Sequence, residues 1–445
     1  MKRPFQETIY GHSRPGGDTL CGSALKTGVP DALRNRRVFI ETYGCRYNFG
    51  DTAKLAAILK HRGCTIVDSP DAADAVIVNT CTVVGPTERR MLRRLSSLGD
   101  RELYVTGCMP AVQRDAILSV CDPVIVSPQA IQESYRDVGT VTGESVAIVQ
   151  IAQGCNGACT YCLTRLARGP LRSFPQEEIL RQVRALAAAG TTEIQLTAQD
   201  VSSYGMDTGH SLAGLLADAG DVPGDYRIRV GMMNPATVME DPDGIADAFA
   251  SDRIFKFVHL PVQSGSDPVL ERMGRRYAVE DFVRIVAAFR KRYPDITIAT
   301  DMIVGFCGET DEDFSRSLDL VRRIRPNKVN VTRYSRRPFT SLSHDKDFPD
   351  SVKKDRSRLL LACAEEVYAK ENARYLGREV PFIVTERIRN GSVMARSPTY
   401  QGIVINEDLP CGSVGQAILK KDRKYFFVGE RVSWTPVSRD GACLP

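Results

Sequence analysis

Three cysteines, Cys155, Cys159 and Cys162, lie close together in the segment AQGCNGACTYCLTRLARG at residues 152–169. Zinc sites and iron–sulfur clusters normally use four protein ligands, so a compact set of three indicates a metal centre with one open position. No Cys or His pair with zinc-knuckle spacing follows it, and the C-x3-C-x2-C spacing differs from that of bacterial ferredoxins. The alternative is a set of buried thiols in a glycine-rich turn.

A second group of cysteines follows three expected strands: Cys45, Cys81 and Cys108 come directly after Tyr-Gly, Asn-Thr and Thr-Gly pairs. The carboxyl ends of parallel strands share one edge of a sheet, where ligands of open α/β folds collect. We therefore expect these thiols to converge and to form a second three-cysteine centre. The alternative is three unrelated buried thiols. Cys64 and Cys121 lie outside this pattern and are assigned to the core or to turns.

Composition limits the class of protein. The chain of 445 residues is too long for one ordinary core, which predicts two or three domains. It has no apolar run of the roughly 20 residues that a membrane span needs and no signal-peptide core, so we expect a cytoplasmic protein with no membrane partner. Thirteen cysteines in a reducing compartment favour ligation or burial over disulfides, and a net charge of +5 is compatible with an RNA partner.

Four regions follow from the patterning. Residues 1–35 have the composition of a mobile extension. Strands and helices alternate over residues 36–143, which predicts a parallel, Rossmann-like α/β domain, and over residues 144–376, where six βα units predict a barrel or partial barrel. The period drops to two over residues 377–440, which predicts a small OB-like β-barrel. The chain is therefore of the α/β class.

The six central strands are expected at residues 146–151, 193–198, 226–231, 255–262, 296–304 and 328–334. Ser173 and Gln176 are expected to form a capping box for the helix that follows the first strand, residues 146–151. Polar residues follow the strands, on the face where βα barrels have their active sites. These residues are Gln199, Asp200, Asn234, Gln263, Ser264, Asp301 and Arg333. Each one could instead serve only a turn or a cap.

The C-terminal region carries basic and aromatic residues that could contact phosphates and stack on unpaired bases. These are Arg387, Arg389, Arg396, Tyr400, Lys420, Lys421, Lys424 and Tyr425. Scattered lysines are also common on β-barrels that bind no RNA.

An ordered set of segments carries a family resemblance: TYGCRYNFGD, VIVNTCTV, VTGC, GCNGACTYCLTRLARG, LTAQDVSSYG, RVGMMNPATV, HLPVQSGSD and TIATDMIVGFCGETDEDF. Over residues 38–437 the chain resembles the radical S-adenosylmethionine (SAM) methylthiotransferases, with a TRAM-like terminal domain. LTRLARG, LTAQDVSSYG and RVGMMNP are most similar to the archaeal and eukaryotic branch. That branch converts N6-threonylcarbamoyladenosine, next to the anticodon of tRNA, into its 2-methylthio derivative. Cys307 and Phe339 depart from the usual Pro and Gly of the family.

The resemblance implies that Cys155, Cys159 and Cys162 hold a [4Fe–4S] cluster that binds SAM. Tyr161 also fits this signature. It implies a second [4Fe–4S] cluster on Cys45, Cys81 and Cys108. A 5′-deoxyadenosyl radical from SAM would remove the hydrogen at carbon 2 of adenine, and sulfur methylated by a second SAM would join that carbon.

The seven strand-end residues become candidates for SAM and nucleotide contacts. The implied partners are a tRNA and a low-potential electron donor of the ferredoxin or flavodoxin type, and we expect a monomer. Alternatives are a methylthiotransferase acting on another tRNA adenosine or on a protein side chain, and a non-enzymatic iron–sulfur RNA-binding protein.

Overall fold

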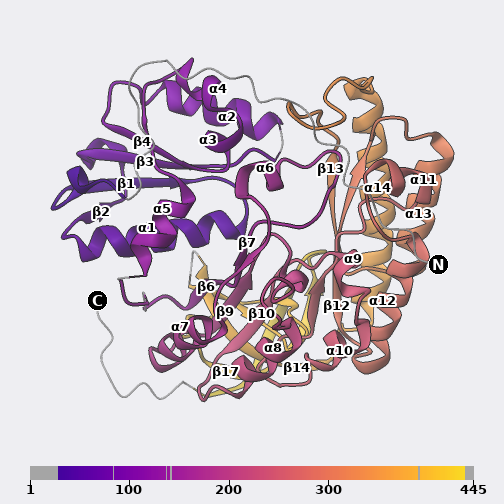
Figure 1. Cartoon of the computed structure of the whole chain (residues 1–445). Helices are drawn as coiled ribbons and strands as arrows, with labels where there is room; N and C mark the ends of the chain where they lie inside the picture. Colours follow the sequence, from indigo (N-terminus) through magenta and orange to yellow (C-terminus); the bar gives the residue numbers. More distant parts are fainter. Residues whose placement is uncertain (1–28, 84, 137, 141–142, 389–390, 436–445) are drawn as a thin grey trace.

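The computed structural model describes residues 29–83, 85–136, 138–140, 143–388 and 391–435 (Figure 1). Most of the expected mobile extension, residues 1–28, therefore lies outside the described residues. Its last part packs against the N-terminal domain: Val29 and Leu33 are buried in that domain's core, and Arg62 donates a hydrogen bond to the Val29 carbonyl. Residues 29–35, which the expected extension included, are therefore attached to this domain by apolar packing and hydrogen bonds.

The N-terminal domain is built on a five-stranded sheet in the order β2-β1-β3-β4-β5, with every pairing parallel. Its strands are β1 (Arg37–Thr42), β2 (Thr65–Val67), β3 (Ala75–Thr80), β4 (Leu103–Gly107) and β5 (Val124–Ile125). Its helices are η1 (Asp31–Leu33), α1 (Arg46–His61), η2 (Pro70–Ala72), α2 (Gly85–Ser96), α3 (Met109–Val112), α4 (Arg114–Leu118) and α5 (Pro128–Tyr135). The central strands β3 and β4 are buried along their whole length, as their apolar runs require in a parallel sheet.

The central domain confirms the six expected strands. They are β6 (Val146–Gln150), β9 (Glu193–Thr197), β10 (Arg227–Val230), β11 (Phe257–His259), β12 (Thr297–Val304) and β13 (Lys328–Arg333). They form two parallel three-stranded sheets, which isolated bridges between Ile228 and Ile254 and between Met232 and His259 join into a partial barrel. A short hairpin of β7 (Ala152–Gln153) and β8 (Arg172–Ser173) follows β6.

Helices cover the outside of this partial barrel (Figure 1). The helices of the central domain are α6 (Thr164–Arg168), α7 (Gln176–Ala188), η3 (Val201–Ser203), α8 (Leu212–Asp221), α9 (Pro235–Val238), α10 (Pro242–Asp247), α11 (Asp267–Arg272), α12 (Val279–Arg292), α13 (Asp311–Ile324) and α14 (Asp350–Ala373). The expected capping box at α7 is wrong. The helix has no side-chain cap, and the Ser173 hydroxyl accepts a hydrogen bond from the N–H of Gly205 instead.

The C-terminal domain is a closed five-stranded barrel in the order β14-β15-β16-β18-β17, as expected. Its strands are β14 (Glu379–Ile388), β15 (Ser392–Arg396), β16 (Gly402–Ile405), β17 (Val414–Asp422) and β18 (Phe427–Thr435). It packs against the residues that begin the central strands: the Tyr400 hydroxyl donates to Glu193, the first residue of β9, at 2.7 Å. The barrel thus covers the amino ends of these strands, and the cysteine array follows a carboxyl end. In the described part of the chain, no helix combines the length and apolarity that crossing a bilayer requires.

Candidate active site

The first cysteine group lies in the loop that the β7–β8 hairpin holds in place. The Cys155 N–H donates to the Gly169 carbonyl at 3.2 Å, which closes the loop. A Cβ built at Gly157 would lie 3.2 Å from the Cys155 sulfur and 3.7 Å from the Cys159 sulfur, so both sulfurs face this glycine. Backbone N–H groups donate to two of the sulfurs, from Gly157 to Cys155 at 3.2 Å and from Thr164 to Cys162 at 3.3 Å.

The second cysteine group lies at the carboxyl edge of three adjacent strands, β1, β3 and β4. Cys45 precedes α1, Cys81 follows β3 and Cys108 precedes α3. A Cβ at Gly44 would lie 3.1 Å from the Cys81 sulfur, which shows how closely the β1 turn approaches β3. The parallel sheet therefore brings the three strand ends to one place.

Burial is the largest influence on the pKa of four of these thiols. It raises the pKa of Cys155 and of Cys108 to about 11 each, and it also raises the pKa of Cys81 and Cys159. Neighbouring thiols add to the rise within each group, since Cys45 and Cys81 both act on Cys108. Without a cation, these buried thiols therefore favour their protonated form, and metal binding must displace the protons.

The donor sets fit iron–sulfur clusters better than a single ion. Among the described residues, no three His, Cys, Asp or Glu side chains stand close enough together to hold one metal ion. In a [4Fe–4S] cluster each thiolate binds a different iron, so the sulfurs need not meet at one point. Thiol-only ligands, burial and N–H···S hydrogen bonds are the features by which proteins hold and tune such clusters.

One cavity of about 100 Å³ is lined by members of both cysteine groups, Cys108 and Cys162. Its other lining residues include Tyr161, Arg333 and Arg337. The Arg337 guanidinium crosses to the N-terminal domain, where it donates to Thr82 at 3.2 Å and pairs with Glu88 on α2. The cavity therefore lies between the two domains, with a thiol from each.

Two of the expected contact residues support the first cysteine loop. The Gln199 side-chain oxygen accepts a hydrogen bond from the Gly154 N–H at 2.6 Å. The Tyr161 hydroxyl accepts one from Arg275 at 2.6 Å, and its ring packs edge-on against Phe306 at 5.8 Å between centroids.

Asp200 and Asn234 form one buried hydrogen-bond network. Asp200 accepts bonds from Ser202, from the Asn234 N–H and from the Thr237 hydroxyl, so protein donors satisfy both its oxygens. The Asn234 side-chain oxygen accepts from Arg275 at 3.2 Å. Asp200 thus orients the segment that carries Asn234, and a direct ligand contact by either residue stays a prediction.

The remaining four candidates, Gln263, Ser264, Asp301 and Arg333, lie in different surroundings. Gln263 has a φ of 73°, an uncommon conformation for a non-glycine residue, and it lies beside buried Ser264. Asp301 pairs with His259 at 2.9 Å and accepts from Asn330 at 2.6 Å. Arg333, at the end of β13, is exposed. Of these four, the structure brings only Arg333 to the cavity between the cysteine groups.

The structure also shows two arginines that sequence reasoning missed, Arg168, which is buried, and Arg275, which is half-buried. Arg275 lies against Tyr161, and Arg168 lies against Cys108. The available signal for Arg168 was its place in the word LTRLARG, directly after the cysteine array.

The C-terminal barrel presents fewer free RNA-binding candidates than expected. Arg396 stacks on Tyr400 at 4.7 Å, and Tyr400 contacts Phe255 and Phe257 of the central domain. Arg396 and Tyr400 therefore belong to the seam, that is, the interface between the barrel and the central domain. Ion pairs hold Arg387, Lys420 and Lys424, to Asp408, Glu430 and Glu365. Lys421 and Tyr425 are exposed, and Arg389 lies outside the described residues. A second cavity of about 310 Å³ lies on this seam, with Arg227 and Trp434 in its lining.

Comparison with known proteins places this geometry in a family. Residues 149–321 match the model of the radical SAM superfamily, and residues 37–127 match a family described as uncharacterized protein family UPF0004. A Pyrococcus abyssi protein named probable threonylcarbamoyladenosine tRNA methylthiotransferase is 40% identical over 430 residues, which span 89% of this chain and 100% of the relative. The chain belongs to the family of radical-SAM tRNA methylthiotransferases.

The family extends to vertebrates. A Danio rerio threonylcarbamoyladenosine tRNA methylthiotransferase is 33% identical over 428 residues, covering 88% of this chain and 77% of the relative. A solved radical SAM methyltransferase from Kitasatospora setae, with cobalamin and a [4Fe–4S] cluster bound, superposes with a TM-score of 0.47 at 16% identity. That match covers 69% of this chain and 77% of the other. Because residues 149–321 match the radical SAM superfamily, this enzyme has a radical SAM domain, and the cofactors that such a domain implies are SAM and a [4Fe–4S] cluster.

Proposed function

We propose that this enzyme inserts a methylthio group at carbon 2 of N6-threonylcarbamoyladenosine, next to the anticodon of tRNA, with two SAM molecules and two [4Fe–4S] clusters. The observation that carries the proposal is the cavity between the domains. Cys162, from the array within the radical SAM match, and Cys108, from the N-terminal domain, line the same space. A reaction that joins sulfur to an activated carbon needs both centres at one place.

The substrate explains why a radical enzyme is required. The C–H bond at carbon 2 of adenine has no acidity that a side-chain base could use, so general base catalysis cannot activate it. When bound, the cluster on Cys155, Cys159 and Cys162 with SAM supplies one-electron chemistry for that bond, and the cluster on Cys45, Cys81 and Cys108 supplies a site for sulfur.

The protein's own residues position the reactants and shield them from water. Tyr161 lies within the cysteine array, where a hydrogen bond from Arg275 and an edge-on contact with Phe306 position its ring. Arg337, which pairs with Glu88 of the N-terminal domain, lines the cavity. Arg333 is exposed at the cavity, where its guanidinium suits the carboxylate of the threonylcarbamoyl group. Arg336 is an alternative partner for this carboxylate.

The test is the modification itself. Anaerobically reconstituted enzyme, SAM, dithionite and tRNA that carries threonylcarbamoyladenosine should yield the 2-methylthio nucleoside in a digest analysed by mass spectrometry. Cells that lack the gene should lose that nucleoside. An unchanged amount in such cells would exclude this substrate and favour another tRNA adenosine or a protein side chain. A non-enzymatic iron–sulfur protein would release no 5′-deoxyadenosine from SAM.

Iron content tests the two cysteine groups separately. The wild type should bind about eight irons, and a variant with Cys155, Cys159 and Cys162 all changed to Ala should bind about four. A variant with Cys45, Cys81 and Cys108 changed to Ala should also bind about four. We further propose a ferredoxin- or flavodoxin-type electron donor, a monomeric enzyme, and a cytoplasmic location, where tRNA is modified.

A further inference from the structure

Arg168 is a buried cation at the junction of the N-terminal and central domains. It ends α6, the short helix that begins just after Cys162, and its side chain is 1% exposed. It forms an ion pair at 2.7 Å with Asp51 on α1, whose side chain is 6% exposed. Burying two charges costs free energy that an apolar pair would not, so packing alone does not explain this arginine.

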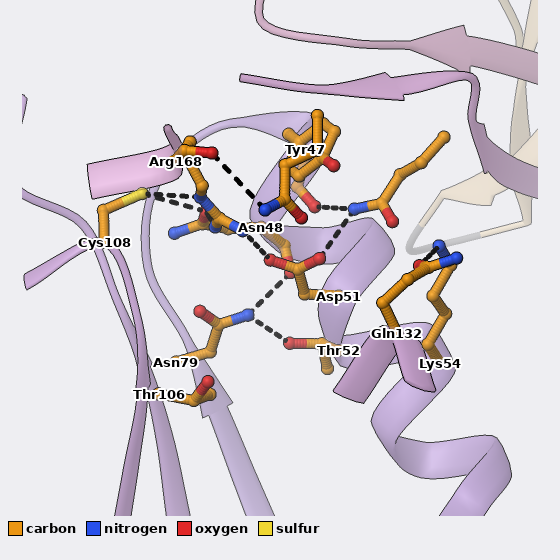
Figure 2. Close-up of polar contacts among 12 residues, drawn as sticks. Tyr47, Asn48, Asp51, Thr52, Lys54, Asn79, Thr106, Cys108, Gln132 and Arg168 are labelled. Atoms are coloured by element: carbon orange, nitrogen blue, oxygen red, sulfur yellow. Dashed lines mark hydrogen bonds and ion pairs between the residues drawn. The ribbon is translucent and has the colours of Figure 1, made fainter. Parts of the chain in front are cut away.

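The three nitrogens of the guanidinium face different partners (Figure 2). One terminal nitrogen pairs with Asp51, and the other donates to the Asn48 side-chain oxygen at 2.7 Å. The Nε–H donates to the sulfur of Cys108 at 3.2 Å, and the Tyr47 ring stacks on the plane at 5.0 Å. These three partners, Asp51, Asn48 and Tyr47, all belong to α1. The helix therefore holds the Arg168 guanidinium in the orientation that points its Nε–H at Cys108.

The backbone beside Arg168 holds the other cysteine group. The Gly169 carbonyl accepts the N–H of Cys155 at 3.2 Å, and the Arg168 carbonyl accepts the Gln153 side chain at 3.4 Å. Gly154 packs so closely on this segment that a Cβ there would lie 1.9 Å from the Pro170 carbonyl oxygen. Residues 168–170 therefore touch the loop of the first cysteine group and a sulfur of the second.

We propose that Arg168 is a positioning residue that ties the two cluster sites together and raises the reduction potential of the cluster on Cys45, Cys81 and Cys108. This inference rests on the proposed function, which assigns those cysteines as ligands. A [4Fe–4S] cluster on three thiolates becomes more negative when it accepts an electron, and hydrogen bonds to its sulfurs are an established determinant of its potential. Asp51 balances the charge of Arg168, but the N–H dipole still points at the sulfur.

The test uses the full chain with Cys155, Cys159 and Cys162 changed to Ala, so that only the second cluster remains. In this background we compare Arg168→Gln combined with Asp51→Asn, which leaves no unpaired buried carboxylate, with Arg168→Lys. The matched control is Arg165→Gln, because Arg165 is exposed on the same short helix. Each protein is reconstituted anaerobically, assayed for iron and sulfide, and titrated with dithionite while the reduced cluster is followed by electron paramagnetic resonance.

We expect all four proteins, including the parent, to bind about four irons. The potential should be more negative in both Arg168 variants, with reduction at least about tenfold less favourable, as for the loss of a hydrogen bond to a charged group. A lysine ammonium can pair with Asp51, but it cannot also donate a hydrogen bond to Cys108, because it lacks the separate, fixed N–H groups of the guanidinium. The control should keep the parent potential.

The outcomes separate this inference from the proposed function. If the parent binds no iron, the ligand assignment of Cys45, Cys81 and Cys108 is wrong. If the parent and the variants bind iron and the potentials agree, Arg168 does not tune the cluster and the inference is overturned. If the double variant unfolds, judged by its thermal midpoint, the Arg168→Lys protein decides: a lowered potential supports the inference and a parent potential overturns it.

Discussion

Lys54, on α1, is a buried basic residue that is 6% exposed. Its nitrogen lies 5.5 Å from the centre of the Tyr135 ring and 5.2 Å from the centre of the Phe174 ring. Burial lowers its pKa to about 8, against the opposing effect of Asp51 and Glu178. Below pH 8 the residue is protonated in both the folded and unfolded states. Between pH 8 and its ordinary pKa of 10.5 only the folded state has lost the proton, so this residue makes the free energy of unfolding rise with pH.

Replacing Lys54 with Met should remove this dependence. At pH 7.5 the variant should be more stable than the wild type by up to about 3 kcal/mol, the cost of keeping the buried charge. The difference should shrink by pH 9.5. Thermal midpoints at the two pH values measure it, and Lys60→Met, at an exposed position of the same helix, should show no such change. A difference that is constant across this range would contradict the assignment.

At the scale of elements, the paired strands β7 and β8 and the loop between them position the first cysteine group. Gly154 has a φ of +83° and no room for a side chain, because a Cβ would collide with the carbonyls of Pro170 and Gly169. We predict that Gly154→Ala displaces Cys155 and lowers iron content from about eight to about four per chain. Reconstituted iron and sulfide measure the effect. Gly139→Ala, where a Cβ meets no atom within 4 Å, should keep about eight.

At the scale of the whole molecule, the C-terminal barrel closes the amino-end face of the central strands through Tyr400. Its hydroxyl donates to Glu193, which is 1% exposed, and its ring packs on Phe255 and Phe257. Tyr400→Phe should lower stability by about 1–2 kcal/mol, because it leaves a buried carboxylate with one donor fewer. The thermal midpoint and protease cleavage within residues 377–435 measure this. Tyr425→Phe, at a ring that is 57% exposed, is the control and should change neither.

The local sequence pattern was sufficient to predict the architecture of the chain and the family to which it belongs. Apolar runs that alternate with helical patterns predicted the parallel N-terminal sheet and the six central strands, because parallel strands are buried on both faces. A period of two predicted the closed C-terminal barrel, because only one face of its strands is buried. The position of Cys45, Cys81 and Cys108 after three strands predicted their common sheet edge, since parallel strands all end on the same side. These inferences needed only residues that are near one another in the chain.

Tertiary structure decided how the remaining side chains are used. Ser173 and Gln176 have the spacing of a capping box, yet Ser173 bonds to Gly205, 32 residues away. Tyr400 and Arg396 have the residue types of an RNA surface, yet they stack on each other in the seam with the central domain.

Arg168 had no marker beyond its place in a motif, yet it contacts Asn48 and Cys108, which are 120 and 60 residues away. Residue type and spacing determine what a side chain can do and which local element it joins. Its partner depends on how the domains pack, because a hydrogen bond or ion pair forms between atoms that are close in space, whatever their separation in the chain.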